Sequence, residues 1–313
     1  MSLIKKPSEI EIKQTLSALI YGQPGIGKTT LGCSAPNAVL FDYDGGVQRI
    51  NGAHQVPTVQ IKDWDETNEA LKEIEEEMPE CKTIVIDTVG KMLDFMSANI
   101  IKNDPKMSKR DGSLSLQGYG VRKTMFVNFL KRVSAMGKNV IFIAHEKEEK
   151  RGEETVKRPE VGGSSANDLV KELDLVGYMQ AIGKERTITF DPNESYYAKN
   201  TCNLPAFIKI PVVVDEKGIA KGENNFFNSV IEAYKEAQEN NKNATSEYED
   251  LMDLIRGYVE DANDIETINS LVEKIPTLQH VFNSKMLASK LLNEKAIKLG
   301  LKLNKQTKKY EAA

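Results

Sequence analysis

The chain is poor in cysteine and has no long apolar run. Its three cysteines, Cys33, Cys81 and Cys202, lie far apart and form no C-x-x-C pair. This spacing excludes a zinc site of paired cysteines and a disulfide framework, and it is typical of a reducing cytoplasm. No stretch approaches the roughly 18 consecutive apolar residues of a membrane helix. The first residues, Met-Ser-Leu-Ile-Lys-Lys-Pro, lack the apolar core of a secretion signal. We therefore expect a cytoplasmic protein with no membrane partner.

The chain also lacks a strong excess of charge of either sign. Its 42 Lys and Arg residues stand against 46 Asp and Glu residues, which gives a formal net charge of −4. Overall charge therefore does not indicate a nucleic-acid-binding protein, and any basic surface must be local. With 313 residues, 40% hydrophobic and 28% charged, the composition is that of a globular protein with one large domain and a small one, or with two domains.

One sharply defined motif is present near the N-terminus. Residues 22–29 read G-Q-P-G-I-G-K-T and match the phosphate-binding pattern G-x-x-x-x-G-K-[ST] at every fixed position. An apolar segment of strand length, residues 16–21, precedes the motif, and residues 30–33 are compatible with a first helical turn. A strand, a glycine-rich loop and a helix form the context in which this motif binds a nucleoside triphosphate.

The motif assigns a role to each part of the loop. Its glycines allow a concave backbone whose N–H groups face phosphate oxygens, and the helix N-terminus adds its dipole. Lys28 would reach the β- and γ-phosphates, and the Thr29 hydroxyl would ligate Mg²⁺. The predicted ATP-binding residues of this segment are Gly22, Gln23, Pro24, Gly25, Ile26, Gly27, Lys28, Thr29 and Thr30.

Apolar runs of strand length alternate with helical segments through the first two-thirds of the chain. The expected strands are residues 16–21, 38–41, 58–61, 83–86 and 140–144, and the expected helices are residues 28–34, 65–77, 89–101 and 121–136. Continuous apolar strands separated by helices predict an α/β fold whose mostly parallel sheet is covered on both faces. Shorter strands at 187–190, 195–199 and 207–214 predict antiparallel additions at one edge of this sheet.

The last quarter of the chain has a different pattern. Residues 238–246 are polar and without periodicity, which indicates a linker. Beyond them, apolar residues recur at helical spacing up to a lysine-rich end. We predict an ATPase domain over 1–236, a linker over 237–246 and a small helical domain over 247–313. The lysines at its end are interpreted as a solvated helix face in preference to a phosphate-binding patch.

Three further polar residues follow apolar strands and are candidates for chemistry. Asp87 ends the run 83–86 and would hold Mg²⁺ beside Thr29, although an aspartate at this place can also cap a helix. Asp44 follows the strand 38–41 and would polarise the attacking water, with Asp42 as the second candidate and a plain Asp-Gly turn as the alternative. His145 follows the strand 140–144 and would sense the γ-phosphate. The predicted catalytic residues are Lys28, Asp44 and His145.

The order of these elements resembles the RecA-like ATPases, and most closely the core-only RecA-like proteins of bacteriophages that act in recombination and single-strand annealing. The resemblance runs from residue 16 to residue 214 and rests on 22–30, 40–46, 83–91, 140–146 and 197–205. It implies a RecA-like P-loop core, ATP and Mg²⁺ as cofactors, and the cytoplasm of a bacterial host if the chain comes from a phage. Proteins related to RecA mostly carry glutamate where this chain has Asp44, which implies slower hydrolysis.

The resemblance also implies partners. Lys199 matches the first of two basic residues that contact ATP on a neighbouring subunit, so a homo-oligomer with ATP between subunits is expected. Thr201 stands where the second basic residue is usual, which implies a weaker contact between subunits. Segments 102–120 and 146–167 match the family's DNA-binding loops in position, which implies single-stranded DNA as a partner. A single-strand-binding protein is a further possible partner. The charges of 146–167 nearly cancel, and Tyr119 is the one aromatic residue in these two segments.

Two other classes of function are compatible with the motif. One is a nucleotide-gated scaffold or helicase-loading ATPase that hydrolyses slowly, which the short side chain of Asp44 favours. The other is a P-loop nucleotide kinase, for which residues 146–158 would have to act as the lid. The acidic residues of that segment argue against a lid that clamps phosphate.

Overall fold

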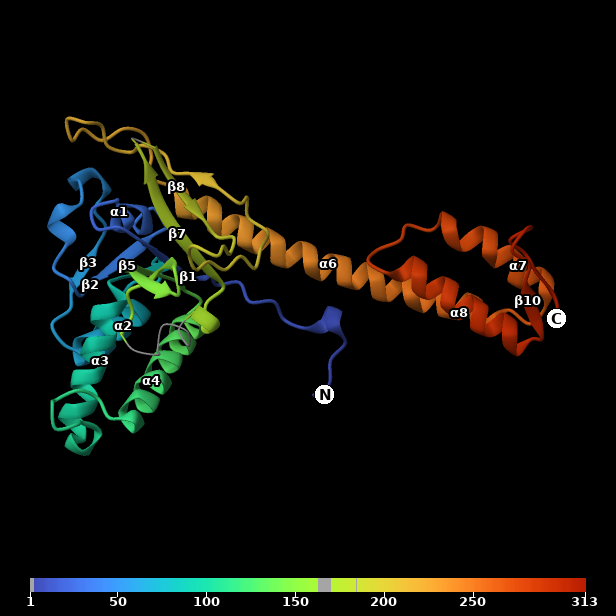
Figure 1. Ribbon diagram of the computed structural model, residues 1–313, viewed down its shortest axis with the longest axis horizontal. Helices are drawn as coiled ribbons and strands as arrows, with labels where there is room; N and C mark the ends of the chain where they lie inside the picture. Colours follow the sequence, from blue (N-terminus) through green and yellow to red (C-terminus); the bar gives the residue numbers. More distant parts are fainter. Residues whose placement is uncertain (1–2, 163–169, 184) are drawn as a thin grey trace. The chain divides into compact units, whose positions relative to one another are not determined.

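The structure is a computed structural model that describes residues 3–162, 170–183 and 185–313. Internal contacts divide the chain into two compact units, Lys13–Ala237 and a smaller one made of Met1–Ile12 with Gln238–Ala313. None of the helices in the described part of the chain combines the length and the apolar composition that a bilayer crossing needs. Figure 1 shows the helices and strands of each unit.

The larger unit is built on a nine-stranded sheet with the order β3-β2-β4-β5-β1-β7-β8-β9, in which β6 pairs with β5. The strands from β3 to β7 in this order run parallel, and β8 and β9 add antiparallel pairs at one edge. The predicted mostly parallel sheet with an antiparallel edge is thereby confirmed. The strands are β1 Ser17–Gly22, β2 Ala38–Asp42, β3 Thr58–Gln60, β4 Thr83–Asp87, β5 Asn139–Arg151, β6 Glu154–Pro159, β7 Leu175–Ile182, β8 Glu185–Thr189 and β9 Ile208–Lys209.

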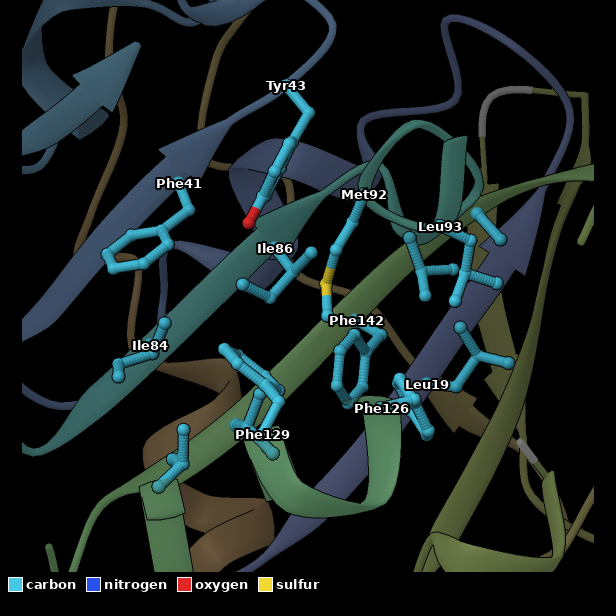
Figure 2. Packing of buried hydrophobic residues seen from close by; sticks show 14 of the residues in the cluster. Leu19, Phe41, Tyr43, Ile84, Ile86, Met92, Leu93, Phe126, Phe129 and Phe142 are labelled. Atoms are coloured by element: carbon cyan, nitrogen blue, oxygen red, sulfur yellow. The ribbon is translucent and has the colours of Figure 1, made fainter. Parts of the chain in front are cut away.

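Helices cover both faces of this sheet because its central strands are apolar on both sides. Every residue of β1, β2 and β4 is buried. On one face the strands pack against α2 Trp64–Glu77, α3 Val89–Asn103 and α4 Leu116–Ala135. Figure 2 shows this packing, with strand residues meeting helix residues; the labelled side chains are Leu19, Phe41, Tyr43, Ile84, Ile86, Met92, Leu93, Phe126, Phe129 and Phe142. The other face packs against α1 Lys28–Gly32 and the start of α6.

Side-chain caps explain where three of these helices begin. The side chains of Asp63, Thr88 and Ser115 each accept a hydrogen bond from a backbone N–H in the first turn of α2, α3 and α4. Helix α1 is shorter than the predicted 28–34. It packs so close to the sheet that a Cβ at Gly32 would lie 3.0 Å from a methyl carbon of Val85.

The two predicted DNA-binding loops are largely regular structure. Segment 146–159 continues β5 and turns into β6, and cross-strand ion pairs such as Arg158 with Glu149 hold this hairpin. Segment 102–120 contains the end of α3, a 3₁₀ helix at Pro105–Met107 and the start of α4. Residues 163–167 of the second loop lie outside the described residues.

The antiparallel edge differs from the prediction in detail. Strand β7 was not predicted, and the expected strand at 195–199 makes only isolated bridges, among them Val176 with Lys199. Of the expected strand 207–214, only the two residues of β9 join the sheet. Residues 207–214 contain Pro211, which has no N–H to donate to a strand ladder, and the pairing of all three segments depends on neighbours that are distant in sequence.

The smaller unit has its own apolar core, as expected for a small helical domain. It contains the later part of α6 Phe226–Asp261, together with α7 Ile265–Lys274, α8 Ser284–Lys298 and the hairpin of β10 Leu301–Leu303 and β11 Tyr310–Ala312. Its core includes Ile255, Ile268, Ala288 and Leu292. The predicted linker 237–246 lies within α6, because its Glu, Gln, Lys and Ala residues favour helix even without an apolar stripe. Residues 1–12, predicted to be part of the ATPase domain, group with this unit, where the Ser8 hydroxyl donates to Glu249.

Candidate nucleotide-binding site

The P-loop joins the end of β1 to the start of α1, and its glycines are required by geometry. Gly25 and Gly27 have φ values of 76° and 95°, in the left-handed region that side chains rarely adopt. Gly22 is held between strands, where a Cβ would lie 2.4 Å from the carbonyl oxygen of Met179 on β7. The loop therefore has the backbone shape that the motif predicts. Within it, Gln23, Pro24 and Gly25 are exposed and Ile26 is buried.

The Gly22→Ala substitution is expected to lower the free energy of unfolding by about 1–3 kcal/mol, because the added methyl group meets backbone that cannot rotate away. Chemical denaturation measures this change. Gly52→Ala is the matched control, since a Cβ there has open space, and it should change stability by less than about 0.5 kcal/mol. Equal stability of the two variants would contradict the tight approach of β1 to β7.

Lys28 is held at the mouth of the loop. Its side chain is 5% exposed, and Nζ donates hydrogen bonds to the carbonyl oxygens of Gly22 at 2.9 Å and Gln23 at 2.7 Å. Burial lowers the pKa of Lys28, while the nearby charges of Asp87 and Glu146 act in the opposite direction. The ammonium group is thus desolvated and preorganised beside the loop, where an anionic ligand would meet a poorly hydrated cation.

Thr29 and Asp87 lie in direct contact. Thr29 Oγ1 donates to Asp87 Oδ2 at 2.6 Å. Burial raises the pKa of Asp87; the hydrogen bond from Thr29 lowers it, and the charges of Asp42 and Asp44 raise it further. A hydroxyl and a buried carboxylate are hard oxygen donors, and Mg²⁺ is commonly held by one or two carboxylates together with phosphate oxygens and water. The pair therefore fits the predicted Mg²⁺ position.

The register of the sheet brings the other predicted residues to the same edge. Asp42 pairs with Asp87 across β2 and β4, and Gly22 pairs with His145 across β1 and β5. Because these strands are parallel, their carboxyl ends share one edge. Asp44 is two residues beyond β2, exposed, and near enough to raise the pKa of Asp87.

The structure separates the two aspartates that follow β2. Asp42 is buried, and its carboxylate accepts hydrogen bonds from the backbone N–H groups of Gly46 at 3.0 Å and Val47 at 3.1 Å. Its acceptor atoms therefore stabilise the turn after the strand. Asp44 has its carboxylate in solvent and remains the candidate for polarising water. His145 is half-buried, and its Nδ1 is buried without a hydrogen-bond partner among the described residues.

Lys199 is not brought together with these residues. It pairs with Val176, three positions before the residue of β7 that pairs with Gly22. Its Nζ donates to the carbonyl oxygens of Lys171, at 3.2 Å, and Leu173. Within one chain Lys199 thus lies near the start of β7, away from the carboxyl ends of the parallel strands where the P-loop lies. A contact with ATP on a neighbouring subunit stays a prediction.

Two residues near the site were not predicted. The Glu146 side chain is 9% exposed, forms an ion pair with Lys157 at 3.2 Å and acts electrostatically on Lys28. Arg186, at the start of β8, lies beside Gly27 of the P-loop. Glu146 directly follows the predicted sensor His145, so its position along the chain was a usable signal. Nothing in the sequence relates Arg186 to the P-loop, because this contact depends on the unpredicted strand β7.

Comparison with known proteins agrees with this geometry. A family model described as AAA domain matches residues 14–202, which is more than half of the chain. The matched region contains the P-loop, Asp44, Asp87, His145 and Lys199. No match was found among curated proteins. The chain therefore belongs to the AAA domain family and is a nucleotide-binding P-loop ATPase.

Proposed function

We propose that this ATPase is a RecA-like protein that acts on single-stranded DNA, in recombination or strand annealing of the bacteriophage type. The observation that carries the proposal is the pairing of Gly22 with His145. It places the P-loop beside the point where β5 leaves the sheet and continues into the hairpin with β6. His145, the proposed sensor of the γ-phosphate, is therefore in the same strand as a segment that can contact DNA. The protein would work in the cytoplasm of a bacterial host.

The proposed reaction is hydrolysis of ATP at the sheet edge. Lys28 binds the β- and γ-phosphates, and Thr29 and Asp87 hold Mg²⁺, which would neutralise phosphate charge. Asp44 accepts a hydrogen bond from the attacking water and orients it toward phosphorus. His145, whose Nδ1 has no partner among the described residues, hydrogen-bonds the γ-phosphate and responds to its loss.

Charge in the described structure favours the 104–115 turn over the β5–β6 hairpin as the first contact with DNA. In the hairpin, Lys157 is paired with Glu146 and Glu148, and Arg158 with Glu149. In the turn, Lys106, Lys109 and Arg110 are exposed. These basic side chains would contact phosphates without reading sequence.

We expect single-stranded DNA to increase the ATPase rate several-fold, because DNA that reaches from the 104–115 turn to the β5–β6 hairpin would restrain the strand that carries His145. The rate is measured with and without an oligonucleotide, and binding of the same oligonucleotide is measured with and without ATP across a salt series. The logarithm of the binding constant should fall linearly with the logarithm of salt concentration. Absence of binding at low salt with ATP present would rule out the DNA role and leave the ATPase site intact.

A nucleotide-gated scaffold or helicase-loading ATPase is the second candidate, and the exposure of Asp44 favours it. The short, solvent-exposed carboxylate of Asp44 would orient the attacking water poorly, so hydrolysis would be slow. In that case ATP would drive assembly into oligomers, with Lys199 completing the neighbouring site, and turnover would stay low. Sedimentation with ATP and with ADP tests this alternative. Assay of phosphate transfer to a panel of nucleotides tests the less favoured kinase function.

A further inference from the structure

Arg186 occupies a place that the P-loop motif does not explain. It is an exposed residue of β8, next to the turn between β7 and β8, where it pairs with Ala181. A Cβ at Gly27 would lie 3.1 Å from Nη1 of Arg186, so the guanidinium group lies against the loop. Its backbone is fixed, because its carbonyl oxygen accepts a hydrogen bond from the N–H of Ile210 at 2.9 Å. No ion pair joins Arg186 to any residue that the structure describes.

The charge of a nucleoside triphosphate leaves room for a second cation at the phosphate site of a single chain. A nucleoside triphosphate carries about four negative charges near neutral pH, and Lys28 with one Mg²⁺ offsets three of them. Lys199, which was predicted to contact ATP on a neighbouring subunit, lies away from its own P-loop, and its Nζ donates to main-chain carbonyl oxygens. Arg186 is a basic side chain already in contact with the loop, and its planar fork suits phosphate oxygens.

A cavity extends from this guanidinium group along the outside of the loop. It has a volume of about 930 Å³ and is lined by residues 23–26 of the P-loop, by Arg186 and by the segment from 210 to 221. Ile210, Pro211, Val212 and Ile219 supply apolar surface, and Val212 is 64% exposed. The wall also carries charged groups of both signs, Lys217 and Lys221 with Asp215 and Glu216, and Lys221 forms an ion pair with Asp215 at 3.9 Å. The size of the cavity and its mixture of apolar and polar groups suit a base and a sugar beside a phosphate chain.

We propose that Arg186 binds the phosphate chain of the nucleotide within its own subunit and that the cavity beside it receives the sugar and base. The inference rests on nucleotide binding at the P-loop and is independent of the DNA role. Arg186 stabilises the bound polyphosphate by charge-assisted hydrogen bonds, and the apolar wall stabilises the nucleoside by burial.

The proposal is tested by the affinities of four proteins for ATP, ADP, AMP and inorganic tripolyphosphate, all with Mg²⁺, in competition with a fluorescent ATP analogue. The proteins are the wild type, Arg186→Ala, Arg186→Lys and the control Lys209→Ala. Lys209 is a suitable control because it is a nearby exposed cation whose ion pair is with Glu185. Arg186→Ala should weaken ATP and tripolyphosphate by about 10- to 100-fold, as expected for a lost hydrogen bond to a charged group. Arg186→Lys should retain part of the affinity, and Lys209→Ala should match the wild type.

Each part of the proposal has an outcome that overturns it. If Arg186→Ala binds ATP and tripolyphosphate as the wild type does, Arg186 does not bind phosphate. If the wild type binds tripolyphosphate as tightly as ATP, the cavity does not receive the nucleoside. If the wild type binds none of the four ligands, nucleotide binding at the P-loop itself is wrong, which is a different failure. Thermal unfolding of Arg186→Ala at the wild-type temperature shows that lost affinity is not lost folding.

Discussion

Alanine in place of Lys28 is expected to abolish nucleotide binding and ATP turnover, with a loss of at least about 100-fold in turnover. Lys28 is the one buried cation of the loop, and its ammonium group is already desolvated and held by two main-chain carbonyl oxygens. Alanine removes the cationic donor for the β- and γ-phosphates and leaves those carbonyl oxygens without this partner. Release of inorganic phosphate and binding of a fluorescent ATP analogue measure the two effects.

A matched control distinguishes this effect from a general loss of charge. Lys72 lies on α2, exposed and in an ion pair with Glu76, so Lys72→Ala removes the same charge far from the P-loop. That variant should keep wild-type binding and turnover. Undiminished ATPase activity in Lys28→Ala would remove the assignment of the nucleotide site.

The second large effect is expected for Asp87→Asn. Asparagine keeps the shape of the side chain and an oxygen that can accept the hydrogen bond from Thr29, but it removes the negative charge. We expect the affinity for Mg²⁺ in the nucleotide complex to fall by about 10- to 100-fold, and turnover to fall with it at limiting Mg²⁺. ATP binding in the presence of a chelator should change by only a few-fold, because Lys28 and the loop amides remain.

Asp44→Asn is the companion variant, since it should reduce turnover without changing the Mg²⁺ requirement. Titration of the ATPase rate with Mg²⁺ separates the two aspartates. A wild-type Mg²⁺ titration in Asp87→Asn would show that this carboxylate is only a structural partner of Thr29.

The central sheet could be predicted from the sequence because its signals are local. Strands β1, β2 and β4 are continuous apolar runs, and α-helices follow β1 and β4 after short connections. The β5–β6 hairpin could not be predicted in this way. Its residues are mostly charged, and its pairing depends on cross-strand contacts such as Lys157 with Glu148. Strand β7 contains Gly177, which weakens an isolated strand but is required here, because a Cβ would lie 2.6 Å from Ile188.

The residues of the site also divide into those predicted from local sequence signals and those whose position depends on the fold. The motif gives Lys28 and Thr29, and the rule that parallel strands end at one edge places Asp87, Asp44 and His145 beside them. Residues whose position depends on the antiparallel edge were beyond that reasoning. Arg186 on β8 reaches the P-loop across β7. Lys199 is held near the start of β7, away from the P-loop, by its bridge with Val176. The roles of the motif residues could therefore be predicted from the amino-acid sequence. The residues that surround the phosphate groups could be identified only from the fold.

Strand β5 runs without interruption from Asn139 to Arg151, so one piece of backbone passes from the centre of the sheet to the tip of the hairpin. The tip lies six residues beyond His145, a reach of about 20 Å at the usual rise of an extended chain. A tilt of a few degrees at the phosphate end is therefore amplified into a displacement of an ångström or more at the far end. The strand therefore has the proportions of a lever that pivots where its pairing with β1 and β4 ends.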